Sequence, residues 1–353
     1  MPKVRKLMEK GFQLLTFTDR AFTPPFYAVI EVNERCCLKC KQCNLWKDGL
    51  SKHTENKKLL TDSEIVQVIQ DIRKWNPLTK TLMFCGGEPF LEKSIFDYIK
   101  VAKRLKFFTT ITTNAFMINE KMAKQIVESG LDELCFSLDA PTAEIHDDIR
   151  GVSGSFEKVM KANEMINRYK KELNLDKPFL RVNTVISNLN YKHLKEMPAL
   201  MKKMEIREYD AQYITVLTPE IKNYVDGIYN RDVCPSQWIL PQELLIPKEE
   251  KDEFWNVISD LKKEAETNEV HLGLRLYNEV QPCSILWGSL LVDSYGEIFP
   301  CTMLRDSAGN VKDKKIKQIW NSQNMKNTRK LFNGKKLNSV CTRCCIYPNV
   351  FFR

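Results

Sequence analysis

Six short apolar segments alternate with longer segments of helical periodicity over residues 26–217, and this alternation limits the possible folds more than any other feature. A strand followed by a crossover helix normally returns as a parallel strand, so repeated units of this kind predict an α/β protein with a parallel sheet. Six successive units are enough to close, or nearly close, such a sheet. We therefore expect a partial (β/α)6 TIM-like barrel with catalytic groups at the carboxyl ends of its strands. The predicted strands are 26–32, 81–85, 107–112, 133–138, 180–186 and 210–217, and the predicted helices include 61–74, 94–104, 119–129 and 155–171. Thr61 is the predicted N-cap of the first of these helices, with Glu64 completing a capping box.

The same alternation predicts where the domains begin and end. Residues 1–21 suggest an amphipathic helix, 22–220 form the barrel, and 221–275 form a linker with a helical extension. Around the start of that linker, Pro219, Gly227, Pro235 and Pro241 indicate an irregular loop over 218–242 that leads into a helix near 249–266. Residues 276–353 are predicted to be a small domain made of a β-hairpin and a helix.

Three cysteines follow the first predicted strand at a spacing that indicates a metal centre. Cys36, Cys40 and Cys43 form the pattern C-x3-C-x2-C in the loop that leaves the strand. Three thiolates are one fewer than the four that normally close a cubane iron–sulfur cluster or a structural zinc site. An iron without a protein ligand is able to bind a small molecule directly. A zinc site completed by a distant residue is the alternative.

This spacing resembles the signature of the radical S-adenosylmethionine (SAM) enzymes. The resemblance implies that SAM chelates the open iron of a [4Fe–4S] cluster through its amino and carboxylate groups. An electron from the cluster then breaks the sulfonium C–S bond, and the resulting 5′-deoxyadenosyl radical abstracts hydrogen from a substrate C–H bond. The second predicted strand ends in Gly86-Gly87-Glu88-Pro89, where two glycines permit close approach of a ligand. In the family this motif holds the amino group of the cofactor.

Polar residues at the ends of the next strands are the other candidate cofactor contacts. Asn114, Ser137 and Asp139 follow or end the third and fourth strands, and the resemblance implies hydrogen bonds to the cofactor ribose and carboxylate. Arg150 matches the family arginine that pairs with the cofactor carboxylate, a task suited to a planar guanidinium; a surface arginine is the alternative. Asn183 is a candidate adenosine contact, with Asn190 beside it, and ordinary loop capping is the alternative for both.

A second set of cysteines lies in the C-terminal region. Cys283 and Cys301 flank a predicted β-hairpin, with strands at 289–292 and 297–299, and Cys341 and Cys344 follow a predicted helix at 315–332. Four thiolates would close one site completely. The arrangement resembles the SPASM and Twitch auxiliary-cluster domains attached to radical SAM barrels, which implies one auxiliary [4Fe–4S] cluster with a role in electron transfer. Zinc is again the alternative.

Cys234 is the candidate catalytic thiol. It lies in the irregular segment after the sixth strand, where it is able to cover the barrel mouth and donate a hydrogen atom to a substrate radical, as in radical SAM epimerases. A packed loop cysteine without a chemical role is the alternative.

The composition of the chain indicates its cellular compartment and limits its binding partners. Residues 1–10 have no apolar core followed by small residues, and no apolar run approaches the length of a membrane span, so we expect neither a secretory signal nor a membrane segment. Twelve cysteines in a lysine-rich chain of 353 residues favour metal ligands in a reducing cytoplasm over a secreted disulfide scaffold. The net charge of +9 is scattered along the chain, so we expect no nucleic-acid partner.

The expected function is that of a radical SAM oxidoreductase or maturase that modifies a peptide or natural product. Its partners are a peptide or small-molecule substrate and an electron donor such as flavodoxin or ferredoxin. The alternatives are a dehydrogenase or epimerase of a small sugar-like or amino-acid substrate, and a non-catalytic iron–sulfur or zinc protein.

Overall fold

One mixed β-sheet runs through the molecule and positions every candidate residue. The computed structural model describes residues 19–48, 58–229, 239–276, 285–302 and 304–331. Within these ranges ten strands follow the order β10-β9-β8-β1-β2-β3-β4-β5-β6-β7. The strands are β1 Tyr27–Asn33, β2 Thr81–Gly86, β3 Phe108–Thr113, β4 Glu133–Ser137, β5 Phe179–Ile186, β6 Glu208–Tyr213, β7 His271–Arg275, β8 Ser289–Val292, β9 Glu297–Phe299 and β10 Gly309–Asn310. Neighbours from β8 through β1 to β7 are parallel, whereas β9 and β10 are antiparallel.

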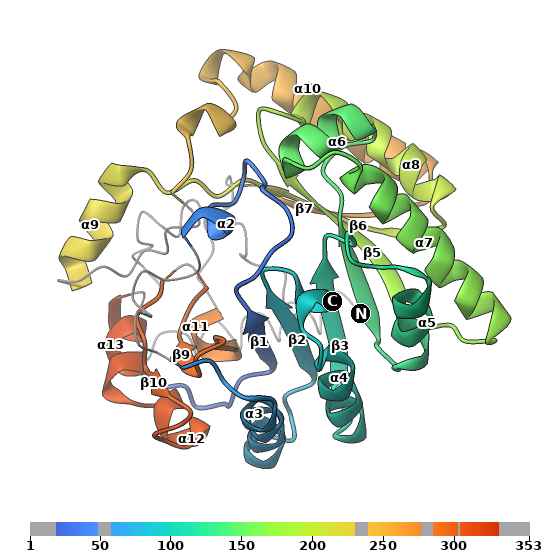
Figure 1. Ribbon diagram of the computed structural model, residues 1–353. Coiled ribbons are helices and arrows are strands. Elements are labelled where there is room, and N and C mark those ends of the chain that lie inside the picture. The colour runs from blue at the N-terminus through green and yellow to red at the C-terminus, as the bar shows by residue number, and fades with distance from the viewer. Residues whose placement is uncertain (1–18, 49–57, 230–238, 277–284, 303, 332–353) are drawn as a thin grey trace, which may run out of the picture.

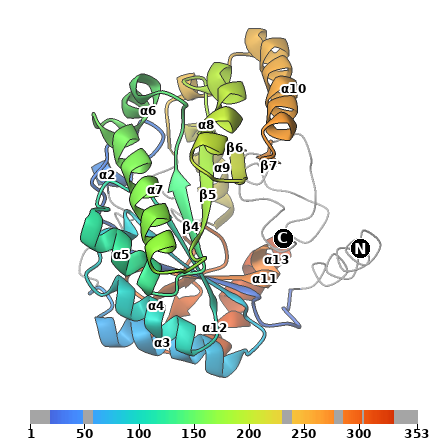
Figure 2. The same ribbon diagram turned by 90° about the vertical axis from the view of Figure 1, so that its right-hand side faces the viewer.

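Helices cover the outer face of the curved sheet, from α3 at the bottom of Figure 1 to α10 at the top, as the turned view in Figure 2 also shows. They are α3 Asp62–Trp75, α4 Ile95–Arg104, α5 Glu120–Glu128, α6 Ala143–Arg150, α7 Ser155–Glu172, α8 Met197–Lys203 and α10 Lys251–Thr267. Shorter elements are α2 Leu45–Asp48, α9 Pro219–Tyr229, α11 Ile285–Gly288, α12 Ile316–Trp320 and α13 Gln323–Leu331, with 3-10 turns at Pro89–Leu91, Tyr191–Glu196, Gln242–Leu244 and Lys248–Glu250. The predicted strand–helix alternation and the partial barrel are confirmed.

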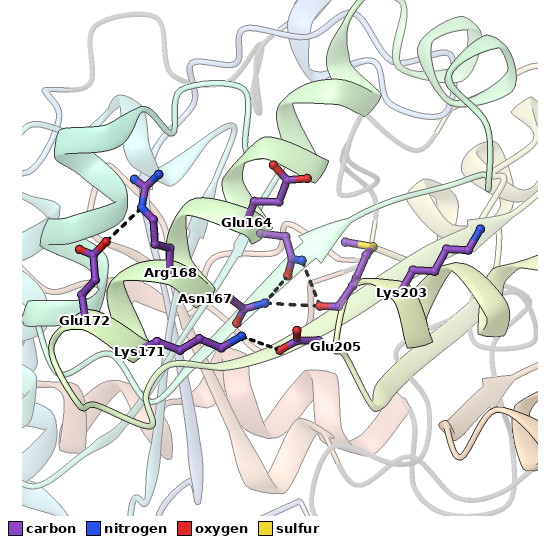
Figure 3. Close-up of a pocket in the computed structure, with 9 residues that line it drawn as sticks. Glu164, Asn167, Arg168, Lys171, Glu172, Lys203 and Glu205 are labelled. Atoms are coloured by element: carbon purple, nitrogen blue, oxygen red, sulfur yellow. Dashed lines mark hydrogen bonds and ion pairs between the residues drawn. The ribbon is translucent and has the colours of Figure 1, made fainter.

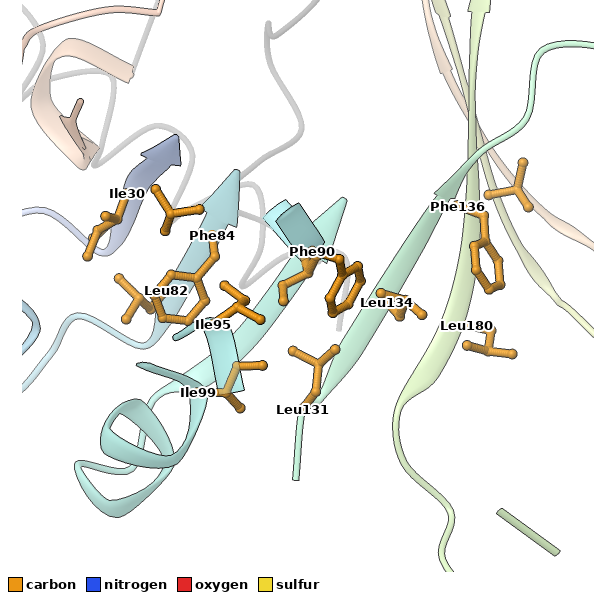
Figure 4. Close-up of a cluster of buried hydrophobic side chains, with 14 of the residues drawn as sticks. Ile30, Leu82, Phe84, Phe90, Ile95, Ile99, Leu131, Leu134, Phe136 and Leu180 are labelled. Atoms are coloured by element: carbon orange, nitrogen blue, oxygen red, sulfur yellow. The ribbon is translucent and has the colours of Figure 1, made fainter. Parts of the chain in front are cut away.

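The main core lies between the outer face of the sheet and these helices. Side chains alternate between the two faces of a strand, so Ile30 of β1, Phe84 of β2 and Phe136 of β4 point toward the helices and are buried. Ile95 and Ile99 of α4 lie beside Leu82 and Phe84 of β2 (Figure 4). Full burial of each such side chain contributes about 1.5–3 kcal/mol. Because alternate residues of each strand are buried against the helices, the residues between them face the interior of the barrel.

The inner face differs in chemistry between its two ends. Near β1, β8 and β9 it carries a small apolar cluster of Val29, Leu291 and Phe299 beside a buried ion pair between Glu31 and Arg305. Near β4 to β7 it carries charges, where Arg181 of β5 pairs with Glu133 of β4 and Asp210 of β6. Paired charges thus lie at both ends of the inner face.

Capping residues account for the start of α3, the helix predicted over residues 61–74. Thr61 is its N-cap, and the Glu64 backbone N–H donates to Thr61 Oγ1 while the Thr61 N–H donates to Glu64 Oε2 at 2.7 Å. This reciprocal capping box was predicted from the sequence and is confirmed.

Two predicted segments differ from the structure, and one strand was not predicted. Residues 219–229 form helix α9 rather than a loop, because Pro219 occupies its first position, where proline is favourable. The predicted helix at 315–332 is two helices, α12 and α13, and the Ser322 hydroxyl accepts from the Met325 N–H where the second begins. Strand β7 was not predicted, since its five residues include Gly273 and are too short for a clear alternation. The helix expected within 1–21 lies almost wholly outside the described residues.

The C-terminal hairpin joins the barrel through β1 and through a buried ion pair. Residues Tyr27 to Ile30 of β1 pair in parallel with Ser289 to Val292 of β8. On the inner face, the Arg305 guanidinium donates to both carboxylate oxygens of Glu31, at 2.9 and 2.6 Å, and both side chains are buried. The guanidinium also stacks 5.0 Å from the ring of Phe299. This contact links β1 to the segment that follows Cys301.

Replacing Arg305 by methionine is expected to lower the free energy of unfolding by about 3–5 kcal/mol, because Glu31 would be left buried without its counter-charge. The urea midpoint of the reconstituted protein measures the effect. The double variant Glu31→Leu/Arg305→Met removes both charges and is expected to recover most of the loss. If the double variant is no more stable than Arg305→Met, the ion pair is not the cause.

Within the ranges that the structure describes, no helix is both long and apolar enough to cross a lipid bilayer.

Candidate metal and cofactor site

The three cysteines of the first motif lie on the loop that leaves the carboxyl end of β1. Cys40 is 8% exposed, and Cys36 and Cys43 are half-buried. The loop backbone is tied to the end of α6, since the Lys39 N–H donates to Arg150 O at 3.2 Å and the Lys41 N–H to Ile149 O at 2.9 Å. Residues more than a hundred positions further along the sequence thus hold the cysteine loop in place.

Polar side chains surround the sulfur atoms. Asn114 Nδ2 lies 3.7 Å from Cys36 Sγ and 3.6 Å from Cys37 Sγ, and Arg150 Nη1 lies 3.9 Å from Cys40 Sγ. A hydrogen bond from the Cys37 thiol lowers the pKa of Cys36 to about 6, and the charge of Arg150 acts in the same direction. Burial raises the pKa of Cys43 to about 11. A bound metal cation lowers the pKa of a coordinating thiol and so offsets the effect of burial.

The donor set of this loop suits an iron–sulfur group. Thiolate sulfur is the ligand that such clusters require, and three cysteines approach one edge of the sheet from a single loop. Arg150 and Asn114 direct N–H groups at the sulfurs, an arrangement that stabilises thiolates bound to metal. Within the described ranges, no three His, Cys, Asp or Glu side chains gather around one point as ligands of a single ion would.

The Gly86-Gly87-Glu88-Pro89 motif packs directly on the cysteine loop. A Cβ atom at Gly87 would lie 2.1 Å from the carbonyl oxygen of Arg35, and one at Gly86 would lie 2.2 Å from that of Asn33. The Gly87 N–H donates to Asn33 O at 3.1 Å, and the Glu88 N–H donates to Arg35 O at 2.7 Å. The sequence indicated glycines that permit close approach of a ligand. The structure adds that they permit close approach of the cysteine loop.

Glu88 connects the ends of β2 and β3. Its side chain is buried, and its carboxylate accepts from Thr113 Oγ1 and the Asn114 N–H, both at 2.8 Å, and from the Phe90 N–H at 3.1 Å. Burial, its largest influence, raises the pKa of this carboxyl to about 7. Pro89 begins the 3-10 turn that follows. The sequence-based contact between Glu88 and an ammonium group stays a prediction.

Asp139 and Arg150 form one buried group beside Cys40. Arg150 Nε lies 2.8 Å from Asp139 Oδ2, and Arg150 is 9% exposed, so the surface-arginine alternative is wrong. Gln42 Nε2 also donates to Asp139 Oδ2, at 2.7 Å, and the Val185 N–H donates to Oδ1 at 3.0 Å. Because a carboxylate only accepts, these bonds fix the orientation of all three side chains.

His146 and Gln42 are site residues that the sequence did not indicate. His146 Nδ1 accepts from the Asp139 N–H at 3.1 Å, and burial lowers the pKa of this histidine to about 3, so it is neutral. Gln42 is distinguished in the sequence only by its position between Cys40 and Cys43. Their roles depend on contacts that only the folded chain creates.

The remaining candidates on strands β4 and β5 fall into two groups. Ser137 and Asn183 are register partners on the inner face, with side chains that make no hydrogen bonds in the described part of the chain. Asn190, by contrast, donates to Asp139 O at 2.7 Å and accepts from the Ser187 N–H, which is the loop-capping alternative. Ser137 and Asn183 thus remain available to a ligand.

The second cysteine set is described only in part. The β8–β9 hairpin is confirmed, with Leu291 opposite Phe299 and Val292 opposite Ile298, and Cys301 follows it. Cys283, Cys341 and Cys344 lie outside the described residues, as does the proposed catalytic thiol Cys234.

One pocket lies away from this chemistry, on the outer surface of α7 and the end of α8 (Figure 3). Its polar groups already contact one another: Asn163 and Asn167 donate to Met204 O, and Lys171 pairs with Glu205 at 3.5 Å. It contains no candidate catalytic residue.

Comparison with known proteins places this geometry in context. Residues 30–200 match the model of the radical SAM superfamily, and residues 283–345 match the SPASM model, an iron–sulfur cluster-binding domain. The AdoMet-dependent heme synthase of Methanosarcina barkeri is 24% identical over 325 residues, which are 89% of this chain and 86% of that protein. The PqqA peptide cyclase of Granulibacter bethesdensis is 28% identical over 222 residues, 61% of this chain and 52% of that one.

Two solved structures share the fold. Streptococcus suis SuiB bound to its precursor peptide SuiA matches with a TM-score of 0.67 and 16% identity, over 97% of this chain and 74% of that one. The protein anSMEcpe with bound AdoMet and a peptide matches with a TM-score of 0.64 and 18% identity, over 91% and 86%.

Proposed function

Because this chain belongs to the radical SAM superfamily and carries a C-terminal SPASM domain, we propose that it cleaves SAM reductively at a cluster held by Cys36, Cys40 and Cys43 and modifies a peptide or natural product. The enzyme uses SAM and [4Fe–4S] clusters, as members of these families do. When bound, these groups supply a 5′-deoxyadenosyl radical that abstracts hydrogen from a substrate C–H bond.

The observation that carries this proposal is that two separate parts of the fold hold the cysteine loop in place. The Gly86-Gly87 turn contacts one part of the loop, and the end of α6 contacts another. Asn114 and Arg150 approach its sulfur atoms. A loop held at both sides keeps three thiolates in place when one iron must remain open to a ligand that exchanges at each turnover.

The other site residues are assigned by their position around this loop. We assign Glu88 and the Gly86-Gly87 turn to the amino end of SAM, and Asn114, Ser137 and Asn183 to its ribose and adenine. Asp139 is fully buried against Arg150 and Gln42, so the direct contact expected from the sequence is replaced by a role in orienting Arg150. Arg150 carries the positive charge nearest to Cys40 and is assigned to the SAM carboxylate as well as to the thiolate. The inner face of the sheet binds the substrate and excludes water.

A peptide substrate is supported by the names of the relatives, which include a peptide cyclase and a protein bound to its precursor peptide. The auxiliary cluster of the SPASM domain, assigned to Cys283, Cys301, Cys341 and Cys344, would accept the electron left after oxidation of the substrate. A flavodoxin or ferredoxin in a reducing cytoplasm would supply the first electron. The charged side chains of the inner face favour a second candidate, a dehydrogenase or epimerase of a small molecule with ionised groups.

Anaerobic reconstitution tests the proposal. We expect about eight irons and eight sulfides per chain, since two cubanes hold about four of each, and formation of 5′-deoxyadenosine when dithionite and SAM are added. Zinc in place of iron, or iron without cleavage of SAM, would contradict the proposal.

A further inference from the structure

Asn114 follows β3 directly, and its side-chain amide faces the cysteine loop. The residue is 7% exposed, and its Nδ2 lies 3.7 Å from Cys36 Sγ, a distance typical of an N–H···S hydrogen bond. The same Nδ2 lies 3.6 Å from Cys37 Sγ. Asn114 therefore places a neutral, buried donor against the first sulfur of the C-x3-C-x2-C motif.

Backbone groups fix the orientation of this amide. Its Oδ1 accepts from the Phe116 N–H at 2.9 Å. A flipped amide would bring two donors together at this point, so the flipped form is excluded and Nδ2 faces the sulfurs. The Asn114 N–H donates to Glu88 Oε2 at 2.8 Å, and Glu88 is buried. The donor is thus held in place by contacts other than the one it makes to sulfur.

Two thiols compete for this donor, and the spacing of the motif distinguishes them. Cys36 is the assigned ligand, whereas Cys37 lies outside the C-x3-C-x2-C pattern. Cys37 Sγ also lies 3.7 Å from Asn114 Oδ1, to which a thiol donates. Hydrogen bonds to an ionised acceptor are stronger than those to a neutral one. The amide N–H therefore donates to the Cys36 thiolate, and the Cys37 thiol donates to the amide oxygen.

A hydrogen bond to a ligand sulfur affects the reduction potential of an iron–sulfur cluster. Reduction adds one electron and increases the negative charge on the thiolates, so an N–H donor stabilises the reduced form more than the oxidised form. Burial keeps this electrostatic effect large, because little water is present to screen it. The second hydrogen atom on Nδ2 remains for the SAM contact assigned above.

We propose that Asn114 raises the reduction potential of the SAM-binding cluster through an N–H···S hydrogen bond to Cys36. The step that it favours is uptake of one electron from the external donor, and no proton moves along the hydrogen bond. Arg150 approaches Cys40 at 3.9 Å, but Asp139 shares its charge. The inference rests on the proposed function, since it takes Cys36 as a cluster ligand.

An EPR-monitored redox titration of the reconstituted full-length protein, without SAM, tests the inference. Addition of SAM to parallel samples identifies the relevant signal, since only a cluster with an open iron responds to it. Asn114→Leu has a similar volume and no donor, and we expect the equilibrium constant for reduction of this cluster to fall about fivefold. At about 59 mV per tenfold for a one-electron couple, the potential is expected to be about 40 mV lower.

Further variants and an isotope label locate the effect. Asn114→Gln keeps the amide on a longer side chain, and we expect a smaller shift than in Asn114→Leu. Asn183→Leu is expected to leave the potential without SAM unchanged, because the Asn183 side chain makes no hydrogen bond to a cysteine in the described ranges. Iron content and thermal unfolding show that each variant is loaded and folded.

The label tests the hydrogen bond in the unsubstituted protein. Asparagine that carries a nitrogen isotope in its side-chain amide is expected to show a weak nuclear coupling to the reduced cluster by pulsed EPR, and Asn114→Leu is expected to lose it. If Asn114→Leu takes up no cluster, the labelled unsubstituted protein decides the question.

An unchanged potential in Asn114→Leu, no coupling from the labelled asparagine, or the same shift in Asn183→Leu would each overturn the inference. Loss of the shift when Asn114→Leu is combined with Cys37→Ala would also overturn it, because the amide would then act on Cys37. Cleavage of SAM is measured on the same preparations. Cleavage with an unchanged potential in Asn114→Leu refutes the role of Asn114 alone. A shifted potential without cleavage by the unsubstituted protein refutes the proposed function alone.

Discussion

Replacing Cys40 by alanine is expected to reduce formation of 5′-deoxyadenosine to the level of a control without enzyme. Cys40 is the most buried of the three loop cysteines and the one that Arg150 approaches. Two thiolates hold a cubane poorly, so we expect the iron content to fall by about four per chain, while the second cluster remains. Iron analysis and a dithionite-driven assay of SAM cleavage measure the two effects.

Cys135→Ala is the matched control for this experiment. Cys135 is also a buried cysteine, on β4, and lies outside both cysteine motifs. We expect its replacement to leave the iron count unchanged. Retained turnover in Cys40→Ala would remove the basis of the proposed chemistry, and equal loss of iron in both variants would indicate a general effect on folding.

Gly87→Ala is expected to cause a comparable loss through the backbone alone. The added Cβ would lie 2.1 Å from Arg35 O and 2.5 Å from its carbonyl carbon, so one of the two chain segments must move. Such a movement breaks the 2.7 Å bond from the Glu88 N–H to Arg35 O and shifts the start of the cysteine loop. We expect less iron after reconstitution and loss of SAM cleavage, measured as for Cys40→Ala.

Gly227→Ala serves as the control for that substitution. A Cβ at Gly227 meets nothing within 4 Å, and the residue lies in helix α9. Alanine is favoured over glycine in a helix by about 0.5–1 kcal/mol, so this variant is expected to be as stable as the parent or slightly more so, with full activity. Normal iron content in Gly87→Ala would show that the loop tolerates the change.

The sequence predicted the fold well where the pattern was local. Short apolar runs identified β1 to β6, and Thr61 with Glu64 identified the start of α3, because both signals depend on neighbours in the chain. Strand β7 was missed because its place is decided by pairing with β6 rather than by its own composition. Helix α9 was missed because Pro219 reads as a breaker unless the position of the helix start is known.

The candidate site was predictable as a set of residues but not as an arrangement. The strand ends placed Asn114 and Asp139 correctly near the cysteine loop. The contact of that loop with α6, the bond from Gln42 to Asp139 and the ion pair of Arg305 with Glu31 depend on residues far apart in the sequence. A single sequence contains no signal for such contacts.

The pairing of β8 with β1 has a consequence for how this protein can be divided. The boundary near residue 276 stays a prediction, yet the hairpin beyond it supplies the hydrogen-bonding neighbour of the strand that leads into the cysteine loop. In a barrel produced without its C-terminal region, β1 would be an edge strand with unpaired backbone N–H and C=O groups, which are able to pair with other chains. The two parts are therefore poor candidates for separate expression or for exchange between relatives, and any shift in the hairpin is transmitted to the cysteine loop through a single strand.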